Sequence, residues 1–86
     1  MSKLEKWLLA VLSGASDSNL PFSDLRGLLL RLDFEERVRG SHHIFSRPDV
    51  AEILNLQERG GKAKPYQVRQ VRDVILKYRM ARFNDE

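Results

Sequence analysis

The sequence predicts an α+β protein of one domain, in which two helices are followed by three antiparallel strands and a final helix. Apolar residues recur at helical spacing near both ends of the chain, and the residues between them form short alternating runs. The 86 residues suffice for one modest core. A composition of 42% hydrophobic and 31% charged residues is that of an ordinary globular chain.

Residues 1–19 are predicted to form a helix and a linker. The apolar residues of this helix share one stripe: Leu4, Trp7, Leu8, Val11 and Leu12. The stretch from Ser13 to Asn19 is rich in turn formers, so we expect it to end the helix. A second helix should then begin near Ser23, which can cap its first amides. Its predicted buried face is Leu25, Leu28, Leu29 and Leu32, and Gly27 should weaken it slightly.

Three strands are predicted at residues 34–38, 42–47 and 52–57, because these runs alternate and are bounded by turn formers. In the second strand, Ile44 falls on the face opposite His43 and Phe45. If Ile44 enters the core, His43 therefore faces outward. This orientation matters for any chemistry that uses the imidazole of His43.

The last predicted helix begins at Pro65, a residue that suits a first helical turn. Its expected core side carries Val68, Val71, Ile75 and Tyr78. Residues 20–81 then form the domain that follows the N-terminal segment, and residues 82–86 are interpreted as a frayed tail.

The charge is concentrated in the C-terminal third of the chain. Eight cations stand there against the single acid Asp73: Arg59, Lys62, Lys64, Arg69, Arg72, Lys77, Arg79 and Arg82. With a net charge of +3, this distribution favours a polyanionic partner such as RNA. The absence of cysteine excludes disulfides and thiolate metal ligands. No run approaches the about 20 apolar residues of a membrane span, so a cytoplasmic location is expected.

Two adjacent histidines, His42 and His43, begin the second predicted strand. Imidazole can both take and give a proton near neutrality. Neighbouring strand residues point to opposite faces, so the pair is not expected to share a metal ion, and no cofactor is predicted. The stretch Arg59–Lys64 is interpreted as a cationic loop, in which Gly60 and Gly61 allow close approach of a phosphate, although a glycine pair also fits an ordinary turn.

Several segments together resemble the HicA toxins of prokaryotic toxin–antitoxin systems, over roughly Leu20 to Met80. They are Phe22-Ser23-Asp24-Leu25, Phe34-Glu35-Glu36-Arg37-Val38-Arg39-Gly40-Ser41-His42-His43-Ile44-Phe45, Ile53-Leu54-Asn55-Leu56-Gln57 and Gly60-Gly61-Lys62-Ala63-Lys64-Pro65-Tyr66-Gln67-Val68. The most specific part is Gly-Ser-x-His, because that family places its catalytic histidine at the fourth position, which here is His43. Two departures are Asp33, where relatives often have glycine, and the helix before Ser13.

The resemblance implies a fold like a double-stranded-RNA-binding domain, with three strands between helices. It also implies metal-independent cleavage of mRNA, with His43 as the catalytic residue, and a HicB-like antitoxin as the protein partner. From the residues themselves, we expect the phosphates to be bound by Lys62, Lys64, Arg69, Arg72, Gly60 and Gly61. His42 is expected to support the strand or the partner interface.

Two other classes of function remain open. The first is a double-stranded-RNA-binding module without catalysis, because the fold and charge also suit duplex RNA. The second is an interaction protein that pairs with another chain through its leucine-rich helices. The second predicts no salt-dependent affinity for RNA.

Overall fold

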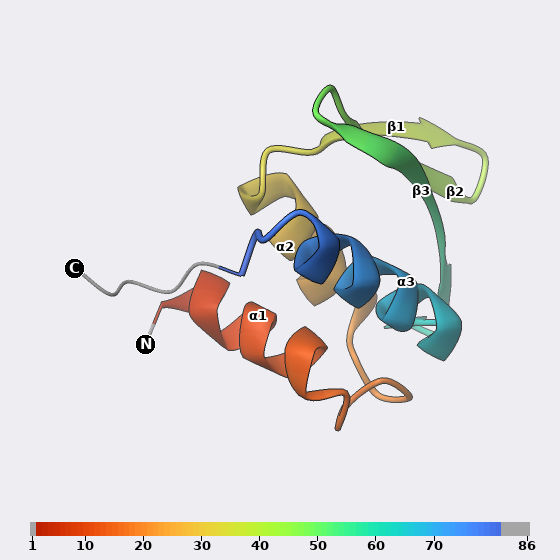
Figure 1. Cartoon of the computed structure of the whole chain (residues 1–86). Helices are drawn as coiled ribbons and strands as arrows, with labels where there is room; N and C mark the ends of the chain where they lie inside the picture. The colour runs from red at the N-terminus through yellow and green to blue at the C-terminus, as the bar shows by residue number, and fades with distance from the viewer. Residues whose placement is uncertain (1, 82–86) are drawn as a thin grey trace.

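A computed structural model describes residues 2–81. Helices α2 and α3 lie against one face of a four-stranded antiparallel sheet, and α1 packs against both helices (Figure 1). The elements are α1 (Lys3–Ser13), α2 (Phe22–Arg31), β1 (Glu35–Arg39), β2 (His42–Arg47), β3 (Val50–Arg59), β4 (Lys62–Ala63) and α3 (Pro65–Lys77). The α+β class and all three predicted helices are confirmed. None of the helices between residues 2 and 81 has the length and apolarity needed to cross a bilayer.

The sheet has four strands rather than the three predicted, in the order β1-β2-β3-β4. The segment interpreted as a cationic loop is instead a hairpin, in which Arg59 pairs with Lys62 and Glu58 with Ala63. Gly60 and Gly61 have φ values of 58° and 80°. Two consecutive positive φ angles suit a two-residue hairpin turn, and glycine adopts them without the steric cost of a Cβ atom. The glycine pair thus extends the sheet by one strand.

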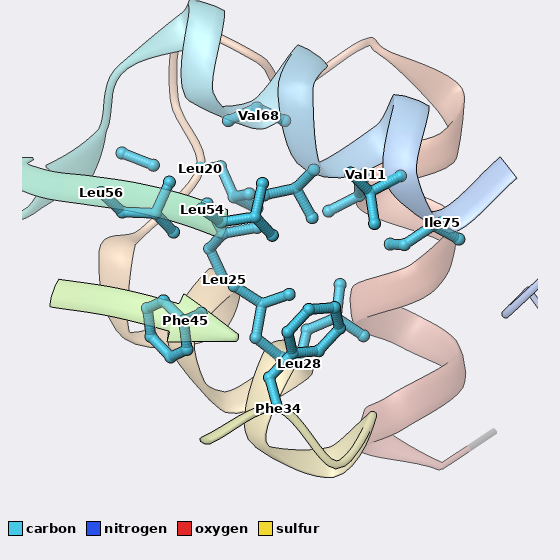
Figure 2. Packing of buried hydrophobic residues seen from close by; sticks show 14 of the residues in the cluster. Val11, Leu20, Leu25, Leu28, Phe34, Phe45, Leu54, Leu56, Val68 and Ile75 are labelled. Carbon is cyan, nitrogen blue, oxygen red and sulfur yellow. The ribbon is translucent and has the colours of Figure 1, made fainter. Parts of the chain in front are cut away.

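One buried cluster joins all the layers of the fold. Figure 2 shows Phe45 and Leu54 projecting from the sheet into the same cluster as Leu25 and Leu28 of α2. Leu8 and Val11 of α1 are also buried in this cluster, as are the predicted core residues Val68, Val71 and Ile75 of α3. The N-terminal segment therefore shares its core with residues 20–81. The predicted tail, residues 82–86, lies outside the described residues.

The helix boundaries follow from local chemistry. Ser2 and Glu5 form a capping box at the start of α1: the Ser2 hydroxyl accepts from the Glu5 amide at 3.2 Å, and the Glu5 carboxylate accepts from the Ser2 amide at 3.0 Å. After α2, Asp33 adopts a φ of 69°. This left-handed conformation favours glycine, which lacks the Cβ atom that makes it costly for other residues.

Ile44 does not enter the core, so the condition under which His43 was expected to face outward is not met. Phe45 is the fully buried residue of β2, and it pairs with Leu54 of β3, which is also fully buried. Ile44 lies on the opposite face, which no helix covers. Because side chains alternate along a strand, His43 points to the same side as Phe45, toward the helices. Phe45 joins the core cluster beside Leu54, and His43 therefore lies on the helix-covered face.

Candidate functional site

The imidazole of His43 lies at the edge of the helix-covered face of the sheet, where 22% of the side chain remains exposed. Its Nδ1 atom is 2.7 Å from Oε2 of Glu36. Glu36 comes from β1 and pairs with Phe45 in the sheet register, so its carboxylate points to the same side as His43. Two neighbouring strands therefore bring an acid and an imidazole together.

Arg26 of α2 binds the same carboxylate. Its Nε atom donates to Oε1 of Glu36 at 3.0 Å and to Oε2 at 2.8 Å. The Arg26 hydrogen bond is the main cause that lowers the pKa of Glu36; burial acts in the opposite direction, and the hydrogen bond with His43 adds to the lowering. Glu36 is therefore ionised near neutral pH, although only 10% of its side chain is exposed.

The charge of Glu36 determines which nitrogen of His43 is free. An ionised carboxylate only accepts hydrogen bonds, so Nδ1 of His43 must carry the proton that it shares with Glu36. In the neutral ring, Nε2 then holds an unprotonated lone pair. This is the arrangement of a general base whose tautomer and orientation are set by a carboxylate.

Phe22 connects His43 to the β3–β4 turn. The Phe22 ring and the imidazole meet in an edge-to-face arrangement, with 4.9 Å between the ring centroids and an interplanar angle of 60°. The backbone amide of Phe22 donates to the carbonyl of Gly61 at 3.0 Å. The first residue of α2 thus holds the imidazole on one side and the predicted phosphate-binding turn on the other.

The two predicted lysines do not join this cluster. Within residues 2–81, Lys62 donates to the side-chain oxygen of Asn19 at 3.2 Å, and Lys64 donates to that of Gln57 at 3.2 Å. Neither forms a hydrogen bond with His43. Gln57 pairs with His42, so the side chain that Lys64 contacts lies on the uncovered face of the sheet. The predicted pairing of these ammonium groups with His43 is therefore absent from this structure.

His42 occupies the uncovered face, as a neighbour of His43 must. Its Nδ1 is 2.9 Å from the side-chain oxygen of Asn55, and its Nε2 is 3.4 Å from the side-chain nitrogen of Gln57. Gln57 also donates to the hydroxyl of Ser41 at 3.1 Å. These contacts tie the β1–β2 turn to β3, in agreement with the expected supporting role of His42.

The two predicted arginines of α3 differ in their surroundings. The guanidinium of Arg72 binds both carboxylate oxygens of Asp17, at 3.0 and 3.2 Å, and donates to the backbone carbonyl of Val11 at 3.0 Å. It thereby attaches the end of α1 and the linker to α3. Arg69 is exposed and forms no ion pair with any of the described residues. Of the two, only Arg69 keeps a free guanidinium.

Sequence reasoning missed Glu36, Arg26 and Phe22 as members of the site. One signal was available, because Glu36 alternates with Phe34 and Val38 and therefore falls on an otherwise apolar face. An acid on such a face requires a partner. No three histidine or acidic side chains among residues 2–81 converge in a way that could hold a metal ion.

Comparisons of the chain with protein-family models, curated proteins and solved structures find no match.

Proposed function

We propose that the protein is a ribonuclease of the HicA type, in which His43 carries out metal-independent general acid–base catalysis on mRNA. Two observations support the proposal: the Gly40-Ser41-x-His43 pattern, and the hydrogen bond of 2.7 Å between His43 and Glu36. The hydrogen bond is the stronger support, because an ionised carboxylate that accepts a hydrogen bond from Nδ1 leaves Nε2 of the partly exposed ring available for proton transfer. We further propose that the fold is of the double-stranded-RNA-binding-domain type, with an added helix and strand.

The proposed reaction uses the nucleophile that RNA already carries. Nε2 of His43 removes the proton from a 2′-hydroxyl, and the resulting oxygen attacks the adjacent phosphorus. The bond from phosphorus to the 5′-oxygen breaks, and that oxygen takes a proton from water or from the imidazolium. The products are a 2′,3′-cyclic phosphate and a 5′-hydroxyl. Glu36 stabilises the imidazolium that forms during the step.

The test is RNA cleavage in the presence of EDTA by the wild type, by His43→Ala and by His43→Gln. Both variants should lose about 10²- to 10⁴-fold in rate, the usual contribution of one proton-transfer group. A substrate with a 2′-deoxy sugar at the cleaved position should remain intact. Equal cleavage by the wild type and His43→Ala would exclude this mechanism.

We propose that the protein partner is a HicB-like antitoxin that covers His43, and that the two proteins meet in the cytoplasm. A partner with an acidic contact surface fits the cationic balance of the chain. The measurement is growth of cells that express the chain, with and without the product of an adjoining gene. Growth arrest that the neighbouring product relieves, and that His43→Ala abolishes, is the expected result.

A non-catalytic double-stranded-RNA-binding module is the second candidate. It is favoured by one observation: Lys62 and Lys64 contact the neutral side chains of Asn19 and Gln57 and not His43. This candidate predicts salt-dependent binding of duplex RNA that His43→Ala leaves unchanged, with no cleavage by the wild type.

A further inference from the structure

The uncovered face of the sheet carries cations from three of its four strands and from the residue that follows β4. The register places Arg39 beside His42, Arg59 beside Lys62, and Arg37 beside Ile44, all pointing away from the helices. Lys64 reaches the same face through its contact with Gln57. These five residues, Arg37, Arg39, Arg59, Lys62 and Lys64, are called the basic face below. Glu35 is an acid on this face, at the end where it pairs with Ser46.

The positive charge of the basic face is not neutralised within residues 2–81. None of its five members forms an ion pair there, and the two lysines contact only the neutral oxygens of Asn19 and Gln57. Other cations of the chain do have carboxylate partners: Arg26, Arg47, Arg72 and Lys77 bind Glu36, Asp49, Asp17 and Glu52. The positive charge of the sheet that has no carboxylate partner therefore lies on the basic face, where a polyanion can reach it.

The groups between these cations suit an unpaired nucleotide chain. His42, Asn55 and Gln57 form a polar network at the centre of the face, and Ile53 beside it is 62% exposed. At the β4 end, a cleft of about 430 Å³ is lined by three members of the basic face and by Tyr66, which is 54% exposed. An aromatic ring and fixed amides can contact base faces and base edges, which a duplex hides.

We propose that the basic face binds a single strand of RNA through its phosphates, and that a base stacks on Tyr66 at the β4 end. This inference rests on the proposed function for the identity of the polyanion. His43 lies on the other side of the sheet, so the strand reaches it by passing the β1–β2 turn at Gly40, which has a φ of 59° and open space around it. The basic face therefore governs affinity, and His43 governs the chemical step.

The experiment measures binding of a labelled, mixed-sequence RNA strand in the His43→Ala background, where cleavage does not interfere. Arg59→Gln with Lys62→Gln is compared with Lys3→Gln with Lys6→Gln, which removes the same charge from exposed positions of α1. Each lost phosphate contact should weaken binding roughly fivefold at about 0.1 M salt and lower the salt slope by about 0.7. The α1 control should bind as the background does, and melting curves should confirm that both variants are folded.

A second comparison isolates the stacking contact. Tyr66→Phe should keep the affinity for the single strand, whereas Tyr66→Ala should lose roughly fivefold or more. Equal weakening by the two double variants would overturn the proposal, as would tighter binding of the same sequence as a duplex. If polyglutamate bound as tightly as the RNA strand, and if this binding also depended on Arg59 and Lys62, the basic face would be assigned to an acidic protein partner instead. Absence of cleavage by the wild type would remove the proposed function but leave these binding results intact.

Discussion

The Nδ1 atom of His43 lies 2.7 Å from Oε2 of Glu36, and both side chains project from the helix-covered face of the sheet. The same carboxylate accepts two hydrogen bonds from Arg26. The carboxylate of Glu36 therefore contacts two groups: the guanidinium of Arg26, which is always charged, and the imidazole of His43, which becomes cationic when it takes a proton. In the proposed mechanism, Glu36 is therefore a positioning residue for His43 and does not itself contact RNA.

Glu36→Gln should lower kcat for RNA cleavage and leave KM nearly unchanged. The amide oxygen can still accept from Nδ1, but it cannot stabilise an imidazolium as a carboxylate does. The expected loss lies between about tenfold and the roughly 10⁴-fold limit set by removing the proton carrier itself. The imidazole N–H resonance of His43, observed by NMR, should also move when its partner loses its charge.

Glu35→Gln is the matched control, because Glu35 is the adjacent residue of β1, points to the uncovered face and loses the same charge. It should keep the wild-type kcat and the wild-type imidazole resonance. If Glu35→Gln and Glu36→Gln reduced kcat equally, net charge rather than the carboxylate–imidazole contact would be responsible.

Gly27→Ala should destabilise the protein, although alanine is the better helix former by about 1 kcal/mol. A Cβ atom at Gly27 would lie 2.7 Å from Cη2 and 2.9 Å from Cζ3 of Trp7. Glycine at this position is thus required by the close packing of α1 on α2. Overpacking of this kind costs about 1–3 kcal/mol in the free energy of unfolding, which urea titration measures.

The Trp7→Leu background separates this clash from other effects. Without the indole, Gly27→Ala should become neutral or stabilising, so the two substitutions should be strongly non-additive. A loss of stability from Gly27→Ala that is the same in both backgrounds would contradict the steric explanation.

Much of the fold could be predicted from the sequence because its elements are amphipathic. The stripes of Leu8 and Val11, and of Val68 and Val71, indicate helices whatever they pack against. The bounds predicted for β2 were also correct. The fourth strand was missed because Gly60-Gly61 was interpreted as a phosphate-binding loop, although a glycine pair between short runs is also a hairpin signal.

The orientation of His43 could not be derived in the same way. Alternation shows that His43 and Phe45 share a face, but not which face the helices cover. Ile44 and Phe45 are both apolar, and only pairing with Leu54 in the folded sheet decides between them. The Arg26–Glu36–His43 contacts join three elements that are distant in sequence, so only the tertiary structure brings them together.

Gln67→Leu should destabilise the protein, even though the substitution places an apolar side chain at a buried position. Gln67 is 1% exposed, and its amide, oriented by its partners, donates to the Gln57 carbonyl at 3.1 Å and accepts from the Gln57 amide at 3.0 Å. The side chain thus continues the β4 ladder after the backbone has turned into α3. Leucine would leave two backbone groups unpaired, at about 1–3 kcal/mol each in the free energy of unfolding.

Gln70→Leu is the control for this substitution, because Gln70 is exposed on the same helix. It should change stability little, by about 0.5 kcal/mol or less. Hydrogen exchange at the Gln57 amide should become faster in Gln67→Leu only. If the Gln57 amide were equally protected from exchange in Gln67→Leu, the Gln67 side chain would not be its hydrogen-bond partner.

The stability of the protein should fall in acid partly through Glu52. Its carboxylate binds Lys77 at 2.8 Å and the Tyr78 hydroxyl at 2.7 Å, and these contacts lower the pKa of Glu52 from 4.5 to about 2. A carboxyl whose pKa is lowered by folding stabilises the fold above its unfolded pKa and loses this contribution as the pH falls. For Glu52, the loss occurs between about pH 4.5 and about pH 2.

Glu52→Gln removes this titration, so the urea midpoint should depend less steeply on pH in that window than in the wild type. The matched control is Glu58→Gln, which removes the same charge from an exposed position of the same strand. Its pH profile should run parallel to that of the wild type. Parallel profiles for Glu52→Gln as well would mean that the contacts with Lys77 and Tyr78 do not hold the carboxylate in solution, where exposed ion pairs are often weak.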